Sequence, residues 1–322
     1  MNFLKRIGIF LLTNFLVMMV LGIVAGLLGL KMEDLWGLLI ICAIFGVGGS
    51  VISLFLSKPM AKASYKIQIV KPGVAHPKVA YLFSAVEKMA EERNIRMPEI
   101  GIYNSRDANA FATGASQNNA LVAFSSTLID RLSEEELSAV AGHEMTHITN
   151  GDMVTMTLLM GVVNTFVMFF ARVLTVIIDN ALRDDRGGGL GFFGYMLGIM
   201  VLQNILMLLA NIPIAAYSRW REFNADAGAA KLVGAAPMIE ALKKIAVAYV
   251  PEKRSDSYIL AKINNQKRIS LFATHPPIEV RIQHLQDCLL YTSDAADDLL
   301  CVDLGGRRII KTKKKTQKNN CY

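Results

Sequence analysis

The chain has 322 residues, of which 53% are hydrophobic and 19% are charged, and its mean hydropathy is +0.37. The charged fraction lies below the roughly one quarter that is typical of soluble domains, so the composition predicts a membrane protein with a soluble part. Three units of the +7 net charge come from residues 288–322, and no basic–aromatic surface motif accompanies the remainder, so we expect no nucleic-acid partner. The four cysteines form no CxxC pair, which favours a reducing compartment.

Four apolar stretches reach the length of about 20 residues that crosses a bilayer. They cover about residues 7–30, 35–56, 153–178 and 192–214. The first is too long for a signal peptide and the second follows at once, so we expect an uncleaved transmembrane hairpin over residues 1–58. The third contains Asn164 and Arg172, which are costly in lipid. Residues 153–215 are therefore expected to form either a second transmembrane hairpin or a partly embedded one.

Positive charge predicts the orientation of these segments. Lys5 and Arg6 precede the first apolar run, and four lysines follow the second, whereas the turn between them has one. The positive-inside rule then places the soluble parts, residues 59–152 and 216–287, in the cytoplasm. The lipid bilayer is the first partner that the sequence implies.

The soluble parts predict an α+β fold. An amphipathic helix follows Pro77, and the short runs "EIGIYN", "NAFATG" and "ALVAFS" predict a small β-sheet. Ser133 and Glu136 then form a capping-box pattern, which predicts a helix from about Glu134 to Thr149. After the fourth apolar run we expect a helix over "SRWREFNADAGAAKLVG", another after Pro237, and a short one after Pro277.

The C-terminal segment 288–322 differs in kind from the rest of the chain. Its text "CLLYTSDAADD" resembles the translation of a sequencing adapter, and the segment has no sustained periodicity. We expect it to be a non-native tail, and the alternative is a natural basic tail.

The stretch "AGHEMTHITNGD" carries the chemistry. His143 and His147 are four residues apart on the expected helix, so both rings share one face, and Glu144 follows the first of them. This H-E-x-x-H pattern offers two nitrogen ligands for zinc and a carboxylate that can act as a base. The alternative is a helix with two histidines that bind no metal.

A catalytic zinc needs a third protein ligand. His76, His275 and His284 are candidates, but Glu222 in "REFNAD" is the stronger one. Asp226 lies four residues later on the same expected helix face, where it could accept a hydrogen bond from a ligand histidine.

Three motifs together carry a family resemblance: "GHEMTHITNGD", "SRWREFNADAGA" and "ATHPPIEVRI". Over about residues 1–287 the chain resembles the HtpX family, bacterial inner-membrane zinc metalloproteases related to the CAAX prenyl proteases. The resemblance implies a gluzincin-type fold that holds one Zn²⁺ on His143, His147 and Glu222, with Glu144 as catalytic base. It also implies that the "NAFATG" strand binds extended substrate, through residues Asn109, Ala110, Phe111 and Ala112.

The expected function is a membrane-bound zinc endopeptidase for protein quality control and stress response. Its substrates would be damaged or unfolded polypeptides and membrane proteins at the cytoplasmic face. The donor that stabilises the tetrahedral oxyanion is left open among His275, Arg219 and Tyr217. The alternatives are a CAAX-type processing peptidase and a non-catalytic membrane scaffold with a structural zinc.

Overall fold

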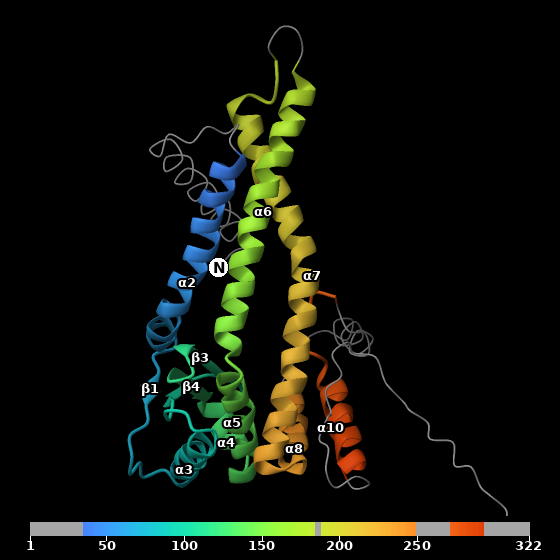
Figure 1. Ribbon diagram of the computed structural model, residues 1–322. Helices are drawn as coiled ribbons and strands as arrows, with labels where there is room; N and C mark the ends of the chain where they lie inside the picture. The colour runs from blue at the N-terminus through green and yellow to red at the C-terminus, as the bar shows by residue number, and fades with distance from the viewer. Residues whose placement is uncertain (1–34, 184–187, 249–270, 293–322) are drawn as a thin grey trace, which may run out of the picture.

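The computed structural model describes residues 35–183, 188–248 and 271–292. Three long helices rise from a compact unit that contains a small sheet and the shorter helices (Figure 1). Within the described residues, these are the helices that are long and apolar enough to cross a bilayer: α2 (Leu35–Tyr65), α6 (Asp152–Leu182) and α7 (Gly191–Val233). Three of the four expected apolar runs are thus helical. The first run lies outside the described residues.

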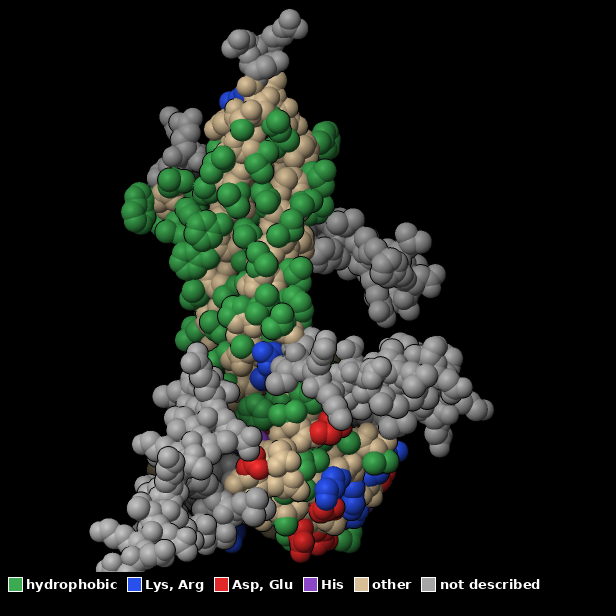
Figure 2. Space-filling model, turned by 90° about the vertical axis from the view of Figure 1, so that its right-hand side faces the viewer, with side chains coloured by type: hydrophobic (Ala, Val, Ile, Leu, Met, Phe, Trp, Pro, Cys, Tyr) green, Lys and Arg blue, Asp and Glu red, His purple; other side chains and the backbone are tan. Residues whose placement is uncertain are grey.

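The surface of the long helices is apolar. Figure 2 shows hydrophobic side chains over the upper part of the molecule, while most of the charged side chains in view lie at the lower end. Large apolar residues are exposed along all three helices, among them Phe55, Phe166, Ile177, Phe193 and Leu208. The rest of the described chain buries most of its large apolar side chains in a core. An exposed apolar surface of this extent therefore indicates contact with a membrane.

The helices α2 and α6 pack closely because glycines line their contact. A Cβ atom on Gly46 would collide with the side chain of Thr165 and lie 2.9 Å from the carbonyl oxygen of Gly161. A Cβ atom on Gly161 would in turn lie 3.0 Å from the Cα atom of Val47. Small residues of this kind let membrane helices approach along their backbones.

Helix α7 corrects one expectation. The sequence predicts a helix after the fourth apolar run as a separate element. The structure instead has one 43-residue helix that continues through Pro213 and ends before Gly234. The change from apolar to polar residues near Ile214 marks a change of surroundings rather than the end of a helix.

The sheet has four strands in the order β1-β2-β4-β3. Strand β2 pairs in parallel with β4, and the outer pairs β1–β2 and β3–β4 are antiparallel. All three predicted β-runs are strands, and the two-residue strand β1 is an addition. The bounds are β1 (Gln68–Ile69), β2 (Glu99–Tyr103), β3 (Ala110–Ser116) and β4 (Asn119–Ser125). Strand β3 is an edge strand.

Helices α3 (Pro77–Glu92) and α5 (Glu134–Thr149) share the main hydrophobic core with the sheet. The fully buried Leu82, Phe124 and Met145 lie in this core. Helix α5 has the predicted bounds, and the capping box forms: Glu136 N donates to Ser133 Oγ at 3.2 Å, and Ser133 N donates to Glu136 Oε2 at 2.8 Å. The short helix α4 (Ser126–Arg131) connects the sheet to α5.

The last two helices of the described chain pack against α5, α7 and each other. Helix α8 (Ala235–Ala248) and helix α10 (Ile278–Thr292) meet around Met238, Leu242 and the fully buried Leu285. Helix α10 follows Pro277, as expected. It runs to Thr292, so the helix extends into the segment that was expected to be a tail from residue 288, and residues 293–322 lie outside the described residues.

Candidate metal centre

Helix α5 presents two histidines on one buried face. His143 and His147 are 6% and 8% exposed, and their Nε2 atoms lie 3.2 Å apart. The rings meet edge to face, with centroids 4.8 Å apart. Two imidazole nitrogens that point at one place inside the protein form a pair of donors for a metal ion.

Helix α7 brings Glu222 to the same place. Its Oε2 lies 3.6 Å from Nε2 of His143, and its Oε1 lies 3.5 Å from Nε2 of His147. Ligand atoms about 2.0–2.1 Å from a tetrahedral zinc would lie about 3.3 Å from one another. The two Nε2 atoms, 3.2 Å apart, are close to this value, and each has a different Glu222 oxygen at 3.5 or 3.6 Å, so the residues fit a metal held by two histidines and one carboxylate. The three residues form the group that could hold a metal ion among the described residues.

A close approach of α5 and α7 makes this spacing possible. A Cβ atom on Gly228 would collide with the side chain of Thr146, and its distance to the Cβ atom of Thr146 would be 2.9 Å. A Cβ atom on Gly142 would lie 3.4 Å from the Cα atom of Ala229. Gly142 and Thr146 stand directly before His143 and His147, and Gly228 stands six residues after Glu222, so the glycines let the two ligand helices lie side by side at the centre.

Each histidine is fixed by a carboxylate at its other ring nitrogen. The Nδ1 atom of His143 lies 2.9 Å from Oδ1 of Asp226, as the sequence predicted for Asp226. The Nδ1 atom of His147 lies 2.6 Å from Oδ2 of Asp152. Such partners fix the tautomer and ring orientation of histidines that bind metal through Nε2.

The charge of these carboxylates acts on the protonation of the histidines. Burial opposes protonation of His147, but hydrogen bonds to Asp152 and Glu222 outweigh it and raise its pKa to about 9. Burial also opposes protonation of His143, where Asp226 and Glu222 raise the pKa. Since a metal binds the neutral ring, metal binding at this centre releases protons.

Two partners of the centre escaped the sequence analysis. Asp152 stands five residues after His147, and Gly151, with a φ of 68°, makes the left-handed turn that returns the chain toward α5. Arg281 of α10 donates to Asp226 through two nitrogens, at 2.6 and 2.8 Å. Both residues belong to motifs that the sequence analysis quoted: Asp152 ends "HITNGD", and Arg281 is the last residue but one of "ATHPPIEVRI".

Glu144 lies next to the donors without joining them. The residue is 8% exposed, and among the described residues none hydrogen-bonds to its carboxylate. Tyr103 lies near enough for the charge of Glu144 to add to the burial that raises the pKa of Tyr103 to about 12. A carboxylate in this position can accept a proton from a water molecule held at the open metal position.

Of the other residues that the sequence offered as candidates, His275 contacts the centre and the rest have other partners. The Nδ1 atom of His275 is 2.9 Å from Oε2 of Glu222, although its side chain is 67% exposed. Arg219 donates to the carbonyl oxygens of Ala273 and Leu271, and the ring of Tyr217 stacks on Trp220. His76 is an exposed N-cap residue of α3, and His284 packs against the ring of Phe223, so neither belongs to the centre.

The "NAFATG" segment forms the start of the edge strand β3. The backbone of Asn109 is already used, because its N–H donates to Ser125 Oγ and its carbonyl accepts from Ser125 N and Tyr103 Oη. Residues 110–112 pair with β4 on one side only. Their other side is the outer edge of the sheet.

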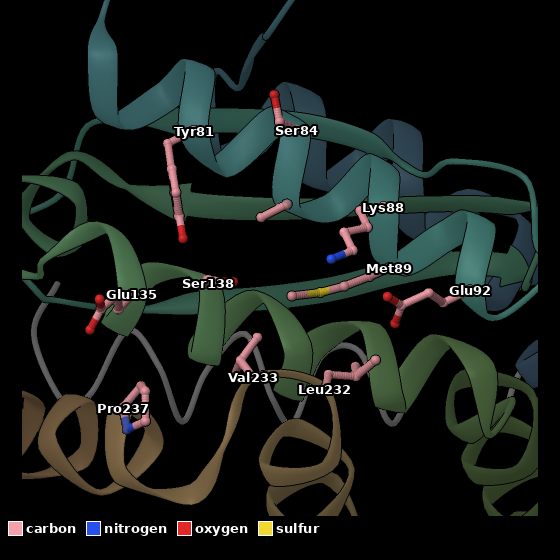
Figure 3. Close-up of a pocket in the computed structure, with 11 residues that line it drawn as sticks. Tyr81, Ser84, Lys88, Met89, Glu92, Glu135, Ser138, Leu232, Val233 and Pro237 are labelled. Carbon is pink, nitrogen blue, oxygen red and sulfur yellow. The ribbon is translucent and has the colours of Figure 1, made fainter.

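A separate hollow of about 610 Å³ lies on another side of α5 (Figure 3). It is bordered by Tyr81 and Lys88 of α3, Glu135 and Ser138 of α5, and Pro237 of α8. None of the three metal donors lines this hollow, so it is distinct from the metal centre.

Known proteins resemble this chain over most of its length. The chain is 46% identical to "Protease HtpX" of Aeromonas hydrophila, over 88% of this chain and 100% of that protein. It is also 46% identical to "Protease HtpX homolog" of Paracidovorax citrulli, over 88% and 99%, and 42% identical to "Protease HtpX" of Chromohalobacter salexigens, over 88% and 98%.

The fold is similar to that of a solved structure. The crystal structure of S. mikatae Ste24p aligns with a TM-score of 0.53 at 18% identity, over 84% of this chain and 65% of that chain. The chain thus spans slightly less than two thirds of that structure. The description "Peptidase family M48" matches residues 77–289, which include the histidine pair, Glu222 and Arg281. The chain therefore belongs to peptidase family M48 and is a membrane metalloprotease.

Proposed function

We propose that this metalloprotease is a zinc endopeptidase of the bacterial cytoplasmic membrane that cleaves damaged or misfolded membrane proteins at the cytoplasmic face. The observation that carries the proposal is the convergence of His143, His147 and the carboxylate of Glu222 at one buried place, with the carboxylate of Glu144 beside them. We assign one zinc per chain to His143, His147 and Glu222. The relatives named Protease HtpX support a proteolytic role for the centre.

The chemistry follows from the positions of the side chains. When bound, zinc supplies Lewis acidity that acidifies water and polarises a carbonyl group. Glu144 takes the proton of the attacking water and passes it to the leaving amine. His275 is proposed to donate to the oxygen that becomes negative, because its ring reaches Glu222 and is open to solvent. Asp226 and Asp152 keep the two histidines in the tautomer that leaves Nε2 free.

Substrate is proposed to bind as an added strand. The outer edge of β3 is available along residues 110–112, and an extended peptide can pair with it through backbone hydrogen bonds. Binding through the backbone tolerates many side chains, which suits unfolded substrates. Asn109 would contribute through its side chain, since its backbone is bonded to Ser125.

The membrane location is proposed from the way the helices continue. Glu222 lies eight residues, roughly 12 Å of helix, beyond Ile214, where the fourth apolar run ends. Asp152, which holds His147, is the first residue of α6, another candidate span. The metal centre would then sit close to the bilayer surface, where loops and ends of membrane proteins are exposed.

The direct test is the substitution Glu144→Gln in the full chain, purified in detergent with a chelator present and then reloaded with zinc. We expect stoichiometric zinc and a fall in casein cleavage of roughly 10²–10⁴-fold, because the base is removed and the ligands are kept. Glu134→Gln, an exposed change on the same helix, is the matched control. Cleavage by Glu144→Gln within a few-fold of the wild type would contradict the proposal and favour a scaffold with a structural zinc.

The CAAX-type processing peptidase is the second candidate, favoured by the fold shared with Ste24p. A fold similarity does not decide the substrate. The two candidates differ in what they accept, because a processing enzyme needs the prenylated end of its substrate. Equal cleavage of prenylated and unprenylated peptides would support the quality-control endopeptidase, and a strict requirement for the prenyl group would support the alternative.

A further inference from the structure

The segment from Leu271 to the start of α10, which we name the strap (residues 271–277), crosses one face of α7. Arg219 donates through Nη1 to the carbonyl oxygen of Ala273 at 2.7 Å and to that of Leu271 at 3.4 Å. Just after these residues, His275 reaches Glu222 at 2.9 Å. Arg219 of α7 thus holds the strap just before His275, which contacts the proposed zinc ligand Glu222.

The contacts from α7 follow a regular spacing. Arg219, Glu222 and Asp226 stand at positions i, i+3 and i+7, so they share one face of the helix. Asp226 is the partner of Arg281, which follows the strap on α10. The strap is therefore fixed at its beginning by Arg219 and beyond its end by the Arg281–Asp226 pair, with His275 between the two.

Hydrogen bonds from Arg219 hold the beginning of the strap. Leu271 and Phe272 are 59% and 48% exposed, so about half of each residue's surface is open to solvent. His275 is mostly exposed as well, so packing does not fix its ring. A hydrogen bond from a charged donor such as the guanidinium of Arg219 is stronger than one between neutral groups.

We propose that Arg219 is a positioning residue that holds the strap so that the imidazole of His275 stays against Glu222 at the metal centre. The inference rests on the proposed function, because it gives His275 a role in that reaction. Arg219 itself acts through the backbone carbonyl oxygens of Leu271 and Ala273 rather than on the reacting atoms. An arginine suits this task, since a single guanidinium nitrogen carries two hydrogens and serves both carbonyl oxygens.

The first test measures the strap itself. Amide hydrogen exchange of the full chain in detergent is compared for Arg219→Gln, Arg219→Lys and Lys231→Gln, all in the inactive Glu144→Gln background to prevent self-cleavage. Lys231 is exposed on the same helix and serves as the control. We expect Arg219→Gln to speed exchange within residues 271–277 about tenfold, the factor that corresponds to losing about 1.4 kcal/mol. Arg219→Lys, which keeps a donor, should restore most of the protection, and peptides from α5 should not change.

The second test measures the connection to His275. With Glu144 intact, Arg219→Gln should lower kcat for a casein-derived peptide about tenfold, with KM within about twofold and zinc content unchanged. In a His275→Ala background the same substitution should lower kcat less than about twofold, because the strap then has no imidazole to position. Thermal unfolding with zinc bound should be similar in all variants.

Three results would overturn the proposal: unchanged exchange in residues 271–277, an unchanged kcat in Arg219→Gln, or an equal loss of kcat with and without His275. Loss of zinc from Arg219→Gln would also overturn it, since that result would make the residue part of metal retention. Failure of the proposed function is seen separately, as cleavage that survives Glu144→Gln, and the exchange measurement does not depend on that outcome.

Discussion

At the scale of single residues, the centre consists of an inner set of donors and an outer set that orients them. His143 and His147 each use one ring nitrogen toward the other donors and one toward an aspartate. The spacing of four residues on a helix predicts that His143 and His147 share one face and that Glu222 and Asp226 share another, whereas the meeting of the two pairs was implied only by the family resemblance. Asp152 and Arg281 could not be predicted, since one depends on the turn at Gly151 and the other pairs with a residue 55 positions away.

The two aspartates are expected to act alike. Asp152→Ala and Asp226→Ala should each keep the metal site but weaken zinc binding roughly 10–100-fold, because the histidine loses the partner that orients it. Competition with a chromogenic chelator, on protein purified and stripped of metal in parallel, measures the affinity. Asp107→Ala, on the exposed loop before β3, is the control. Unchanged affinity in Asp152→Ala would show that the 2.6 Å contact with His147 contributes nothing to the site.

At the scale of helices and strands, the contact between α5 and α7 sets the spacing of the proposed metal ligands. Helix α5 has the bounds that the sequence predicts, because a capping box marks its first residue and Asn150-Gly151 follows its last. The continuity of α7 was not predicted, since helical periodicity persists on both sides of the change in polarity at Ile214. The close approach at Gly228 and Thr146 depends on tertiary packing and leaves no local pattern in the sequence.

Gly228→Ala tests this contact. The added methyl group meets the side chain of Thr146, so we expect α7 to shift from α5, zinc affinity to fall at least tenfold, and the melting temperature to drop. The double variant Gly228→Ala with Thr146→Ala should regain part of both, because most of the collision is with the atoms that Thr146→Ala removes. Zinc titration and thermal unfolding measure the two effects. Independent, additive losses in the double variant would refute the idea that this contact sets the spacing of the ligands.

At the scale of the whole molecule, a membrane bundle and a sheet-containing unit meet at the metal centre. Helix α2 joins the sheet through Lys58, which pairs with Glu99 at 2.9 Å, while α6 and α7 lead from the bundle to Asp152 and Glu222. The apolar runs predicted the three helices of the bundle that the structure describes, because span length follows from bilayer thickness. Their arrangement around the centre was not predictable, because it depends on which glycine-bearing helix faces pack against one another, and tertiary contacts decide that.

The proposed orientation can be tested with single cysteines. In a variant without native cysteines, Lys71→Cys and Lys243→Cys should be protected from a membrane-impermeant maleimide in spheroplasts and react in inverted membrane vesicles. Arg183→Cys, at the end of α6 away from the sheet, should show the opposite behaviour and is the control. The reason is the excess of lysine in the last turns of α2 and directly after it, which favours the cytoplasm. Labelling of position 71 or 243 in intact spheroplasts would reverse the proposed topology.

The most direct measurement of the central claim is the zinc content of two variants, Glu222→Ala and His275→Ala, purified side by side with the wild type and analysed by mass spectrometry of the metal. Glu222 places one carboxylate oxygen 3.6 Å from Nε2 of His143 and the other 3.5 Å from Nε2 of His147, whereas His275 contacts only the carboxylate. Two histidines alone hold a catalytic zinc weakly. We therefore predict that Glu222→Ala loses its zinc and that His275→Ala keeps one zinc per chain. Stoichiometric zinc in Glu222→Ala together with its loss from His275→Ala would contradict the assignment of the metal centre.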